Sequence, residues 1–318
     1  MKIVVLERNS VGEDISVDKL KEFGELICYK NTAYEEIPER IKDADIIIAN
    51  KSKLNEETLK GAEKVKLICE FATGFDNVDI KYCRERGITV TNVSNYSTPA
   101  VVQHTFALAL NLLEHISYYD DFVKSGKYAK HNSFSYYGHL FYELKSLTWG
   151  IIGMGNIGKE VAGIAKAFGC KVIYHSVTGK NNNKDYEQVS FDELLERSDI
   201  LSLHCPLSEL THHIIDEAAL KKMKRSAILI NVARGAVVDK DALYDALING
   251  EIMAAGLDVL DTEPISEDNP LARIKDSEKL IITPHMAWGS VEARSRLVDI
   301  VCDNIDAFLK GEKLNVVN

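Results

Sequence analysis

Three polar side chains suited to acid–base and charge-stabilising chemistry each follow a short apolar run. Arg234 follows the run AILINVA, Glu263 comes shortly after AAGLDVL, and His285 directly follows Pro284 at the end of LIITP. Apolar runs of this length are typical of buried strands in a parallel sheet. The carboxyl ends of such strands meet at the edge where α/β folds bind ligands, so we expect the three side chains to lie at one edge of a sheet.

A glycine-rich segment forms a candidate phosphate-binding loop. Residues 149–158 read WGIIGMGNIG, and Gly153, Gly155 and Gly158 give the pattern G-x-G-x-x-G between an apolar strand and the helical run KEVAGIAKAFG. The first glycine permits a tight turn, the second lets backbone approach a pyrophosphate, and the third lets helix and strand pack closely. The helix N-terminus then offers N–H groups to the phosphates. In this strand–turn–helix context the motif predicts a dinucleotide site that includes Asn156 and Ile157.

The acidic residue expected at the end of the next strand is missing. After KVIY come His175 and Ser176, and Ser176 stands where an Asp or Glu usually binds the ribose hydroxyls. Without that carboxylate a 2′-phosphate is not repelled, and Thr178 and Lys180 could bind one. Alternatively, Ser176 hydrogen-bonds the ribose of NAD and Lys180 is solvated. The sequence therefore leaves both NAD and NADP open as the cofactor.

The three polar residue types suit the reduction of a 2-keto acid. Hydride transfer from a nicotinamide to a carbonyl carbon leaves negative charge on the oxygen; a protonated imidazole can supply a proton there and an arginine can stabilise the charge. The planar guanidinium of Arg234 can grip the carboxylate and the carbonyl together, although a salt bridge to a neighbouring acid is the alternative. A carboxylate such as Glu263 on the other ring nitrogen would orient His285 and favour its protonated form, so reduction is expected to weaken as pH rises.

Short β-branched runs alternate with helical segments, which predicts βαβ units and parallel sheets. We expect residues 99–290 to form a nucleotide-type domain inserted in a smaller α/β domain made of residues 1–98 and 291–318. Strands are expected at 3–6, 45–49, 67–69 and 88–90 in the first domain, and at 149–152, 171–174, 200–203, 227–231, 253–257 and 280–283 in the second.

Three further segments have a distinct pattern. Residues 100–115 form a helical run that is apolar on most faces, which indicates burial between two domains or two subunits. Residues 119–148 are aromatic and irregular, and we predict an extended arm or loop there. The segment 291–311 is amphipathic at helical spacing, with Gly311 as a C-cap. A capping box, Ser190-x-x-Glu193, is expected to open another helix.

Composition narrows the classes of partner and compartment. The 318 residues carry a formal net charge of −10, so nucleic acid and anionic membrane surfaces are not expected as partners. The six cysteines are scattered without metal-ligand spacing, which indicates buried thiols in a reducing compartment and no metal site. The N-terminal apolar run is too short for a signal peptide, and no stretch approaches the roughly 20 apolar residues of a membrane span. We expect a cytoplasmic protein.

The chain resembles the D-isomer-specific 2-hydroxyacid dehydrogenase family over nearly its whole length. The resemblance implies NAD or NADP as cofactor, a Rossmann-type doubly wound parallel sheet, and a smaller domain of flavodoxin-like fold. It also implies catalytic roles for Arg234, Glu263 and His285. The matching stretches are ATGFDNVD at 72–79, NYSTPAVVQHTFAL at 95–108, GIIGMGNIGKEVA at 150–162, LSLHCPLSELTHHII at 201–215, NVARGAVVD at 231–239, GLDVLDTEP at 256–264 and TPHMAW at 283–288.

The resemblance also assigns contacts with substrate and cofactor. The backbone of Thr73 and Gly74 would bind the substrate carboxylate, and Asp258 would touch the nicotinamide amide. Cofactor contacts are further implied for Cys205, Pro206, Thr211 and Val232.

Within the family, the stretches YHSVTGKN and HMAW and the C-terminal tail are most similar to the hydroxypyruvate reductase (glycerate dehydrogenase) branch. We therefore expect hydroxypyruvate/D-glycerate as the substrate pair, with glyoxylate/glycolate second. Trp288 could wall the substrate pocket and donate its indole N–H, or it could serve only in packing. A phosphorylated substrate is not expected, because no basic cluster is evident near the catalytic segments.

Two other functions fit parts of the sequence. A D-lactate or aromatic-lactate dehydrogenase would share the catalytic residues and differ in its preferred keto acid. An NAD(H)-sensing, corepressor-like binding protein could also keep all three residues, and turnover would exclude it. A related formate dehydrogenase would carry glutamine where Glu263 stands. We expect a homodimer whose contacts come from the helix at 100–115 and the arm at 119–148.

Overall fold

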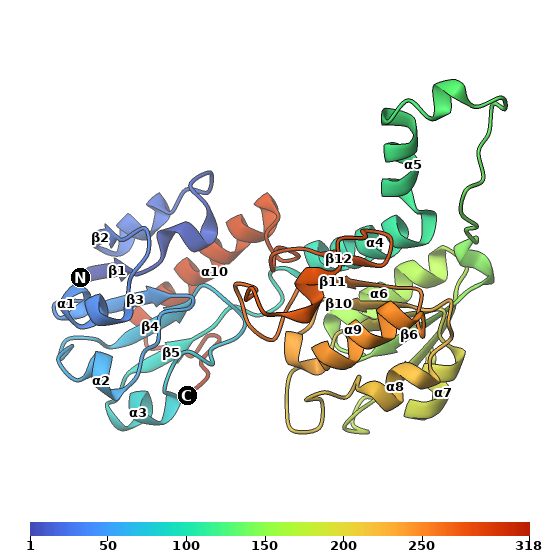
Figure 1. Cartoon of the computed structure of the whole chain (residues 1–318). Coiled ribbons are helices and arrows are strands. Elements are labelled where there is room, and N and C mark those ends of the chain that lie inside the picture. Colours follow the sequence, from blue (N-terminus) through green and yellow to red (C-terminus); the bar gives the residue numbers. More distant parts are fainter. The chain divides into compact units, whose positions relative to one another are not determined.

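The computed structural model describes residues 1–318 and divides the chain into two compact units. The first unit consists of residues 1–97 and 288–318, and the second of residues 98–287 (Figure 1). None of the helices is both long and apolar enough to cross a membrane. The assignment of the substrate to one unit and of the dinucleotide to the other stays a prediction.

The first unit is built on a five-stranded parallel sheet. Its strands are β1 (Lys2–Val5), β2 (Glu25–Cys28), β3 (Ile46–Ala49), β4 (Leu67–Glu70) and β5 (Thr89–Thr91), in the order β2-β1-β3-β4-β5. Its helices are α1 (Ile37–Ile41), α2 (Glu56–Leu59), α3 (Ile80–Glu85) and α10 (Val291–Leu309). Helices α1 to α3 share a core with one face of the sheet, and α10 lies on the other face (Figure 1). This strand order is flavodoxin-like.

The second unit is a doubly wound, seven-stranded parallel sheet. Its strands are β6 (Thr148–Ile152), β7 (Lys171–His175), β8 (Glu187–Gln188), β9 (Ile200–Leu203), β10 (Ile228–Asn231), β11 (Ala254–Leu257) and β12 (Leu280–Ile282), in the order β12-β11-β10-β9-β6-β7-β8. Helices α4 (Thr98–Glu114) and α6 (Asn156–Ala167) pack on one face. Helices α7 (Phe191–Arg197), α8 (Glu217–Lys222) and α9 (Lys240–Asn249) pack on the other. The predicted α/β fold class is confirmed.

Every strand expected from the sequence is present, with ends that differ by at most one residue. The strands β2 and β8 were not predicted because each lies at the edge of its sheet, where it pairs with a single neighbour and is only partly buried or exposed. Ser190 and Glu193 form the predicted capping box at the start of α7. The helix at 100–115 needs no second domain to bury it, since Val102, Leu108 and Leu112 pack in the core of their own unit.

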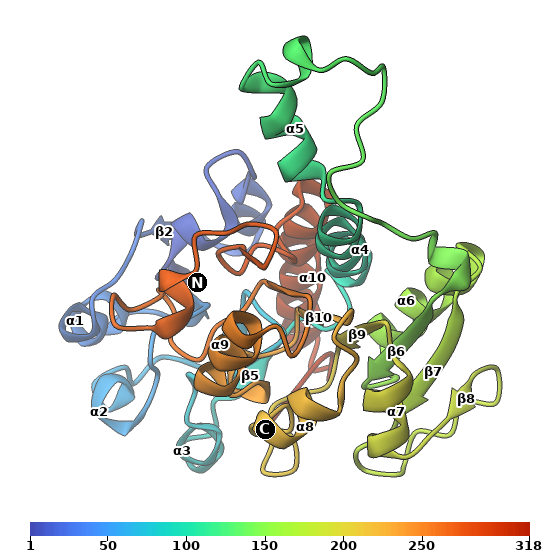
Figure 2. The same cartoon turned by 45° about the vertical axis from the view of Figure 1, so that its right-hand side comes forward.

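The prediction of an extended arm or loop over residues 119–148 is wrong for its first part. Helix α5 (Ile116–Lys124) begins directly after His115, whose backbone is left-handed with φ of 52°, so a single residue separates α4 from α5. The helical pattern is obscured because its aromatic side chains pack on the arm itself: Phe122 stacks on Tyr136 with ring centroids 3.9 Å apart. Beyond α5 the chain is mostly irregular. The helix and the following loop project from the sheet of the second unit (Figures 1 and 2). We refer to residues 116–143 as the aromatic arm.

The first unit contains a buried carboxyl group at the end of β4. Glu70 has no exposed surface, and its carboxylate oxygens accept hydrogen bonds from Asn77 Nδ2 at 3.2 and 3.3 Å. Burial raises the pKa of Glu70 to about 8, and the Asn77 hydrogen bond only partly opposes this. The folded protein therefore binds this proton more tightly than the unfolded chain, so the contribution of Glu70 to stability falls as pH rises from about 4.5 through about 8.

Glu70→Gln is expected to reduce this loss of stability at alkaline pH, because the amide stays neutral while keeping the size and an acceptor for Asn77. Thermal unfolding measured at about pH 6 and about pH 9 should show a smaller difference in Tm for the variant than for the wild type. Glu63→Gln, at an exposed position before β4, is the control and should leave the difference unchanged. Equal differences in all three proteins would show that Glu70 is ionised at neutral pH.

Candidate active site

Arg234, Glu263 and His285 follow the carboxyl ends of β10, β11 and β12. These strands are neighbours in one parallel sheet, so the loops after them emerge at the same edge. The glycine loop follows β6 and therefore opens at that edge as well. All four segments belong to the second unit. The sequence prediction that the three polar residues share one sheet edge is thus met by the topology.

The His285 imidazole and the Glu263 carboxylate form a direct pair. His285 Nδ1 lies 2.7 Å from Glu263 Oε2, and each side chain is 30% exposed. The other carboxylate oxygen, Oε1, accepts the backbone N–H of Leu260 at 2.9 Å, which fixes the orientation of the carboxylate. Because Nδ1 is occupied by Glu263, Nε2 is the ring nitrogen left to exchange a proton with a ligand. His285 has φ of 51°, an uncommon backbone conformation of a kind that clusters at functional sites.

The side chain of Asn231 fixes the backbone of the turn that carries Arg234. This buried side chain donates from Nδ2 to the Arg234 carbonyl at 2.9 Å and accepts from the Ala233 N–H at 3.0 Å. Position 235, directly after Arg234, requires glycine, because a Cβ on Gly235 would lie 1.8 Å from the carbonyl carbon of Leu260. The Arg234 turn therefore packs directly on the segment that leads to Glu263. The guanidinium itself is exposed and donates to the Ala233 carbonyl at 2.8 Å.

Asp258 is buried and holds the segment that contains His285. Its Oδ1 accepts from the Thr283 hydroxyl at 2.6 Å and the Met286 N–H at 2.9 Å, and its Oδ2 accepts from the Ala287 N–H at 2.9 Å. The Asp258 carbonyl accepts the His285 N–H at 2.8 Å. His104 completes the cluster, with Nε2 2.9 Å from Thr283 Oγ1 and 3.5 Å from Asp258 Oδ1. These contacts give Asp258 a positioning role beside the cofactor contact implied by the resemblance.

Asn231, Thr283 and His104 were not singled out in the sequence. Asn231 had a usable signal, since an amide at the last position of the buried strand ILIN has to find internal hydrogen bonds. His104 lies inside an apolar helix, 154 positions before Asp258, and no local pattern connects the two.

The glycine loop has the geometry that close approach of a phosphate requires. Gly153 has φ of +95°, and a Cβ there would lie 2.6 Å from the Cys205 backbone nitrogen. A Cβ on Gly158 would lie 2.2 Å from the Gly153 carbonyl oxygen, whereas Gly155 faces open space. Helix α6 begins at Asn156 with Gly155 as N-cap, and a glycine N-cap has no side chain to accept hydrogen bonds from the first turn of the helix. This arrangement fits a pyrophosphate.

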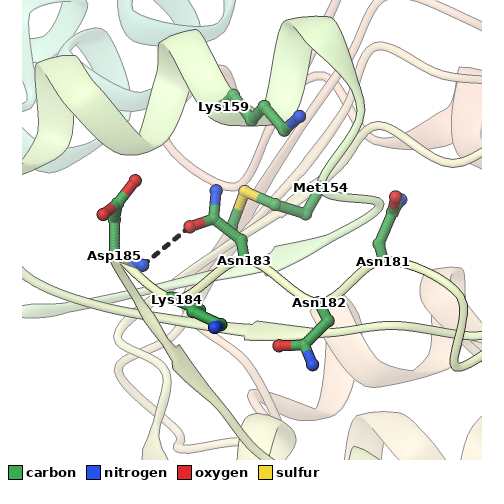
Figure 3. A pocket seen from close by; sticks show the side chains of 7 residues that line it. All are labelled: Met154, Lys159, Asn181, Asn182, Asn183, Lys184 and Asp185. Carbon is green, nitrogen blue, oxygen red and sulfur yellow. Dashed lines mark hydrogen bonds between the residues drawn. The ribbon is translucent and has the colours of Figure 1, made fainter.

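The segment after β7 forms a polar pocket beside the glycine loop. Met154, Lys159 and residues 181–185 line it. Figure 3 shows Lys159 on one side of the pocket and the segment 181–185 on the other. Ser176 is buried, and its hydroxyl accepts the Asn181 N–H at 3.3 Å. Thr178 and Lys180 are exposed and do not line this pocket; its two basic residues are Lys159 and Lys184.

The other residues assigned to the cofactor are held in local turns. The Thr211 hydroxyl is buried, donates to the Pro206 carbonyl at 2.7 Å and accepts the Ser208 N–H at 2.8 Å, so it shapes the 206–211 turn. Pro206 is exposed, whereas Cys205 is buried and offers mainly backbone, which lies against Gly153. Val232, half-buried, lies between Asn231 and the Arg234 turn.

Thr73, Gly74 and Trp288 belong to the first unit. The Thr73 hydroxyl donates to the Val93 carbonyl at 2.8 Å, and the Thr73 carbonyl accepts from Asn92 Nδ2 at 2.7 Å. These bonds fix the turn and leave its N–H groups as the donors for a ligand. The Trp288 ring packs edge-to-face on Tyr96, with centroids 6.2 Å apart.

Comparison with known proteins gives a consistent result. Residues 106–287, more than half of the chain, match the family model described as "D-isomer specific 2-hydroxyacid dehydrogenase, NAD binding domain". A hydroxypyruvate reductase from Blautia hydrogenotrophica is 39% identical, with 100% of both chains covered. A glyoxylate reductase from Korarchaeum cryptofilum is 39% identical over 95% of this chain and 92% of the relative. The solved structure of D-lactate dehydrogenase from Aquifex aeolicus, complexed with NAD and lactic acid, is 32% identical with a TM-score of 0.84, and the match covers 98% and 96% of the two chains.

Proposed function

Because the chain belongs to the D-isomer specific 2-hydroxyacid dehydrogenase family, we propose that it reduces hydroxypyruvate to D-glycerate at the sheet edge that carries Arg234, Glu263 and His285. The reaction class is that of the family, an NAD(P)-dependent interconversion of a 2-keto acid and its 2-hydroxy acid. The observation that carries the assignment of residues is the 2.7 Å pair between His285 Nδ1 and Glu263 Oε2, next to the turn of Arg234. Glyoxylate is the second candidate substrate.

In this proposal each of the three side chains has a defined role. NAD(P)H supplies the hydride when it is bound. His285 donates the proton from Nε2 to the substrate oxygen, and Glu263 stabilises the imidazolium form and keeps the ring in place. Arg234 stabilises the developing negative charge and grips the carboxylate with its planar fork. Since the chain carries a net charge of −10, this local positive group is also what draws an anionic substrate in.

We assign the two units to the two ligands. The second unit, residues 98–287, would bind the dinucleotide through the glycine loop, Ser176 and the turns at Cys205–Thr211, Val232 and Asp258. The first unit would bind the substrate carboxylate through the N–H groups of Thr73 and Gly74, with Trp288 as a further substrate contact. The hydroxyl of Thr73 is already bonded to Val93, which supports a backbone contact rather than a side-chain contact.

A panel of keto acids assayed with NADH and with NADPH tests the substrate. We expect the highest kcat/KM with hydroxypyruvate, followed by glyoxylate, with pyruvate and phenylpyruvate well below. A preference for pyruvate or phenylpyruvate would replace the proposal with a lactate or aromatic-lactate dehydrogenase. Binding of NADH without turnover of any keto acid would instead point to a sensor of the cofactor.

The choice between NADH and NADPH is expected to depend on residue 176. Ser176→Asp keeps an acceptor for the N–H of Asn181, a residue that lines the pocket beside the glycine loop, and adds a negative charge there. Repulsion between that charge and a 2′-phosphate should lower the ratio of kcat/KM for NADPH to that for NADH by at least about tenfold. Ser176→Asn, similar in size but neutral, is the matched control. An unchanged ratio in Ser176→Asp would remove this position as the selector.

We also infer a homodimer formed through the aromatic arm. Phe134, Tyr137 and Leu140 are 92%, 76% and 76% exposed, and large apolar side chains exposed together on one segment are typical of a protein interface. Light scattering of the purified protein at micromolar concentration should give twice the chain mass. Replacing Phe134 and Leu140 by serine should shift the mass toward the monomer, whereas Leu210→Ser, an exposed leucine outside the arm, should not. A wild-type monomer would exclude the dimer.

A further inference from the structure

A second cluster of polar side chains lies at the base of the aromatic arm. His115 is the residue between α4 and α5, His139 is on the returning loop, and Glu278 is on the loop that precedes β12. One ring nitrogen of each histidine and a carboxylate oxygen of Glu278 all lie within 4.8 Å of one another. All three residues belong to the second unit. Because 24 positions separate the histidines and Glu278 lies far beyond them, no ligand spacing was visible in the sequence.

The distances within the cluster suit a tetrahedral metal ion. His115 Nδ1 lies 3.2 Å from Glu278 Oε1, and His139 Nε2 lies 3.6 Å from Glu278 Oε2. Two ligand atoms that each lie about 2.0 Å from a tetrahedral zinc ion are about 3.3 Å apart. Imidazole nitrogen and carboxylate oxygen are also ligands that zinc accepts. The two histidines face different oxygens of Glu278, so one ion bound through a single oxygen requires the carboxylate to turn; the ligand atoms, all within 4.8 Å of one another, then need only small shifts.

Two atoms of the cluster are buried and unsatisfied. His115 is 8% exposed, and neither its Nδ1 nor Glu278 Oε1 has a hydrogen-bond partner, although the two atoms are only 3.2 Å apart. Leaving a buried donor or acceptor without a partner costs about 1–3 kcal/mol, so such atoms call for an explanation. A cation placed between the nitrogen and the oxygen lone pairs would satisfy both.

The backbone around the cluster is already fixed. His115 is held in the left-handed conformation, and its carbonyl accepts the Tyr119 N–H at 3.1 Å. The Tyr119 hydroxyl binds the backbone of His139 on both sides, donating to its carbonyl at 2.8 Å and accepting its N–H at 3.1 Å. The Tyr118 ring packs edge-on against the His139 ring with centroids 4.3 Å apart. Ligands that are positioned in advance lose little freedom when they bind an ion.

This cluster is separate from the candidate active site. Glu278 comes before β12, at the amino end of the parallel sheet, whereas His285 comes after β12, at the carboxyl end. An ion at Glu278 would therefore act on the arm rather than on the reacting groups. It would fasten both ends of the segment 115–139 to the loop before β12.

We propose that His115, His139 and Glu278 bind one zinc ion, with water in the fourth position, and that this ion fastens the aromatic arm to its domain. The expectation of no metal site, drawn from cysteine spacing, did not address such a set of distant residues. A structural ion would reduce the motion of the arm, and it would leave turnover of the keto acid unchanged.

Calorimetric titration of the chelator-treated full-length protein with zinc sulfate tests the proposal. One ion is expected to bind per chain with a dissociation constant in the micromolar range or below. His139→Ala and Glu278→Gln should each weaken binding at least about tenfold, because each removes one of three ligands. His131→Ala removes an exposed histidine of the same arm outside the cluster and should bind zinc like the wild type.

Two further measurements distinguish the loss of one metal-binding side chain from a loss of the folded structure. Cobalt bound at the same place should give the visible absorption of a four-coordinate ion in the wild type and in His131→Ala, and not in His139→Ala. Zinc should also slow cleavage of the arm by chymotrypsin in the wild type. The proposal would be overturned if the wild type showed no saturable zinc binding. It would also be overturned if the wild type, His139→Ala and Glu278→Gln bound zinc with equal affinity. That second result would mean that zinc binds elsewhere, such as at the exposed pair His212 and His213.

Discussion

Replacing His285 by alanine is expected to lower kcat/KM for the preferred keto acid by at least about 100-fold, the scale typical of a lost general acid. The reason lies in the pairing of the ring. Glu263 occupies Nδ1 at 2.7 Å and is itself held by the Leu260 N–H, so the imidazole is oriented with Nε2 available for proton transfer. No other histidine of the second unit follows the carboxyl end of β10, β11 or β12, and alanine leaves the oxygen of the product without a proton donor.

Steady-state reduction of hydroxypyruvate at saturating cofactor is the measurement for His285→Ala. Glu263→Gln should give a smaller loss, because the amide oxygen can still accept from Nδ1–H but no longer carries the charge that stabilises the imidazolium. His212→Ala, an exposed histidine of the same unit, should stay near the wild type. A loss of less than threefold in His285→Ala would remove this residue from the mechanism. Cofactor binding measured in parallel separates a chemical defect from a defect of the fold.

The sequence predicted the sheet edge well because the relevant rules are local. The strands β10, β11 and β12 are short apolar runs, each with one of the three polar residues in the segment after it, and neighbouring parallel strands bring such residues to the same edge. The glycine loop was visible for the same reason, since its strand, turn and helix are contiguous in the chain. The left-handed Gly153 and the tight packing of Gly158 are direct consequences of that contiguous motif.

The parts that escaped prediction depend on contacts between distant segments. Asp258, Thr283 and His104 form one hydrogen-bonded cluster, although several helices and strands separate His104 from the other two in the chain. The cluster of His115, His139 and Glu278 is of the same kind. The end of the first helix near residue 115 was predicted, but helix α5 was missed because none of its side chains is buried and its aromatic residues pack within the arm. Edge strands such as β2 escaped because partial burial weakens their apolar pattern.

Arg234→Ala is expected to lower kcat/KM by a similar factor, at least about 100-fold, and to raise KM as well as to lower kcat. Arg234 is proposed to bind the carboxylate in the ground state and to stabilise charge on the carbonyl oxygen in the transition state, so both constants should respond. The backbone of its turn should survive the substitution, because Asn231 and Gly235 position that backbone independently of the guanidinium. The effect can therefore be read as loss of the side chain.

Arg234→Lys is the matched variant, since it keeps the charge and loses the planar fork. If only the charge mattered, as it would for general attraction of an anion to a protein of net charge −10, lysine would restore nearly full activity. If a two-point grip on carboxylate and carbonyl matters, lysine should recover KM in part and leave kcat at least about tenfold low. Alanine activity within threefold of the wild type would show instead that the guanidinium is only a surface group bonded to the Ala233 carbonyl. The split between KM and kcat across the two variants thus distinguishes attraction of the substrate from stabilisation of its transition state.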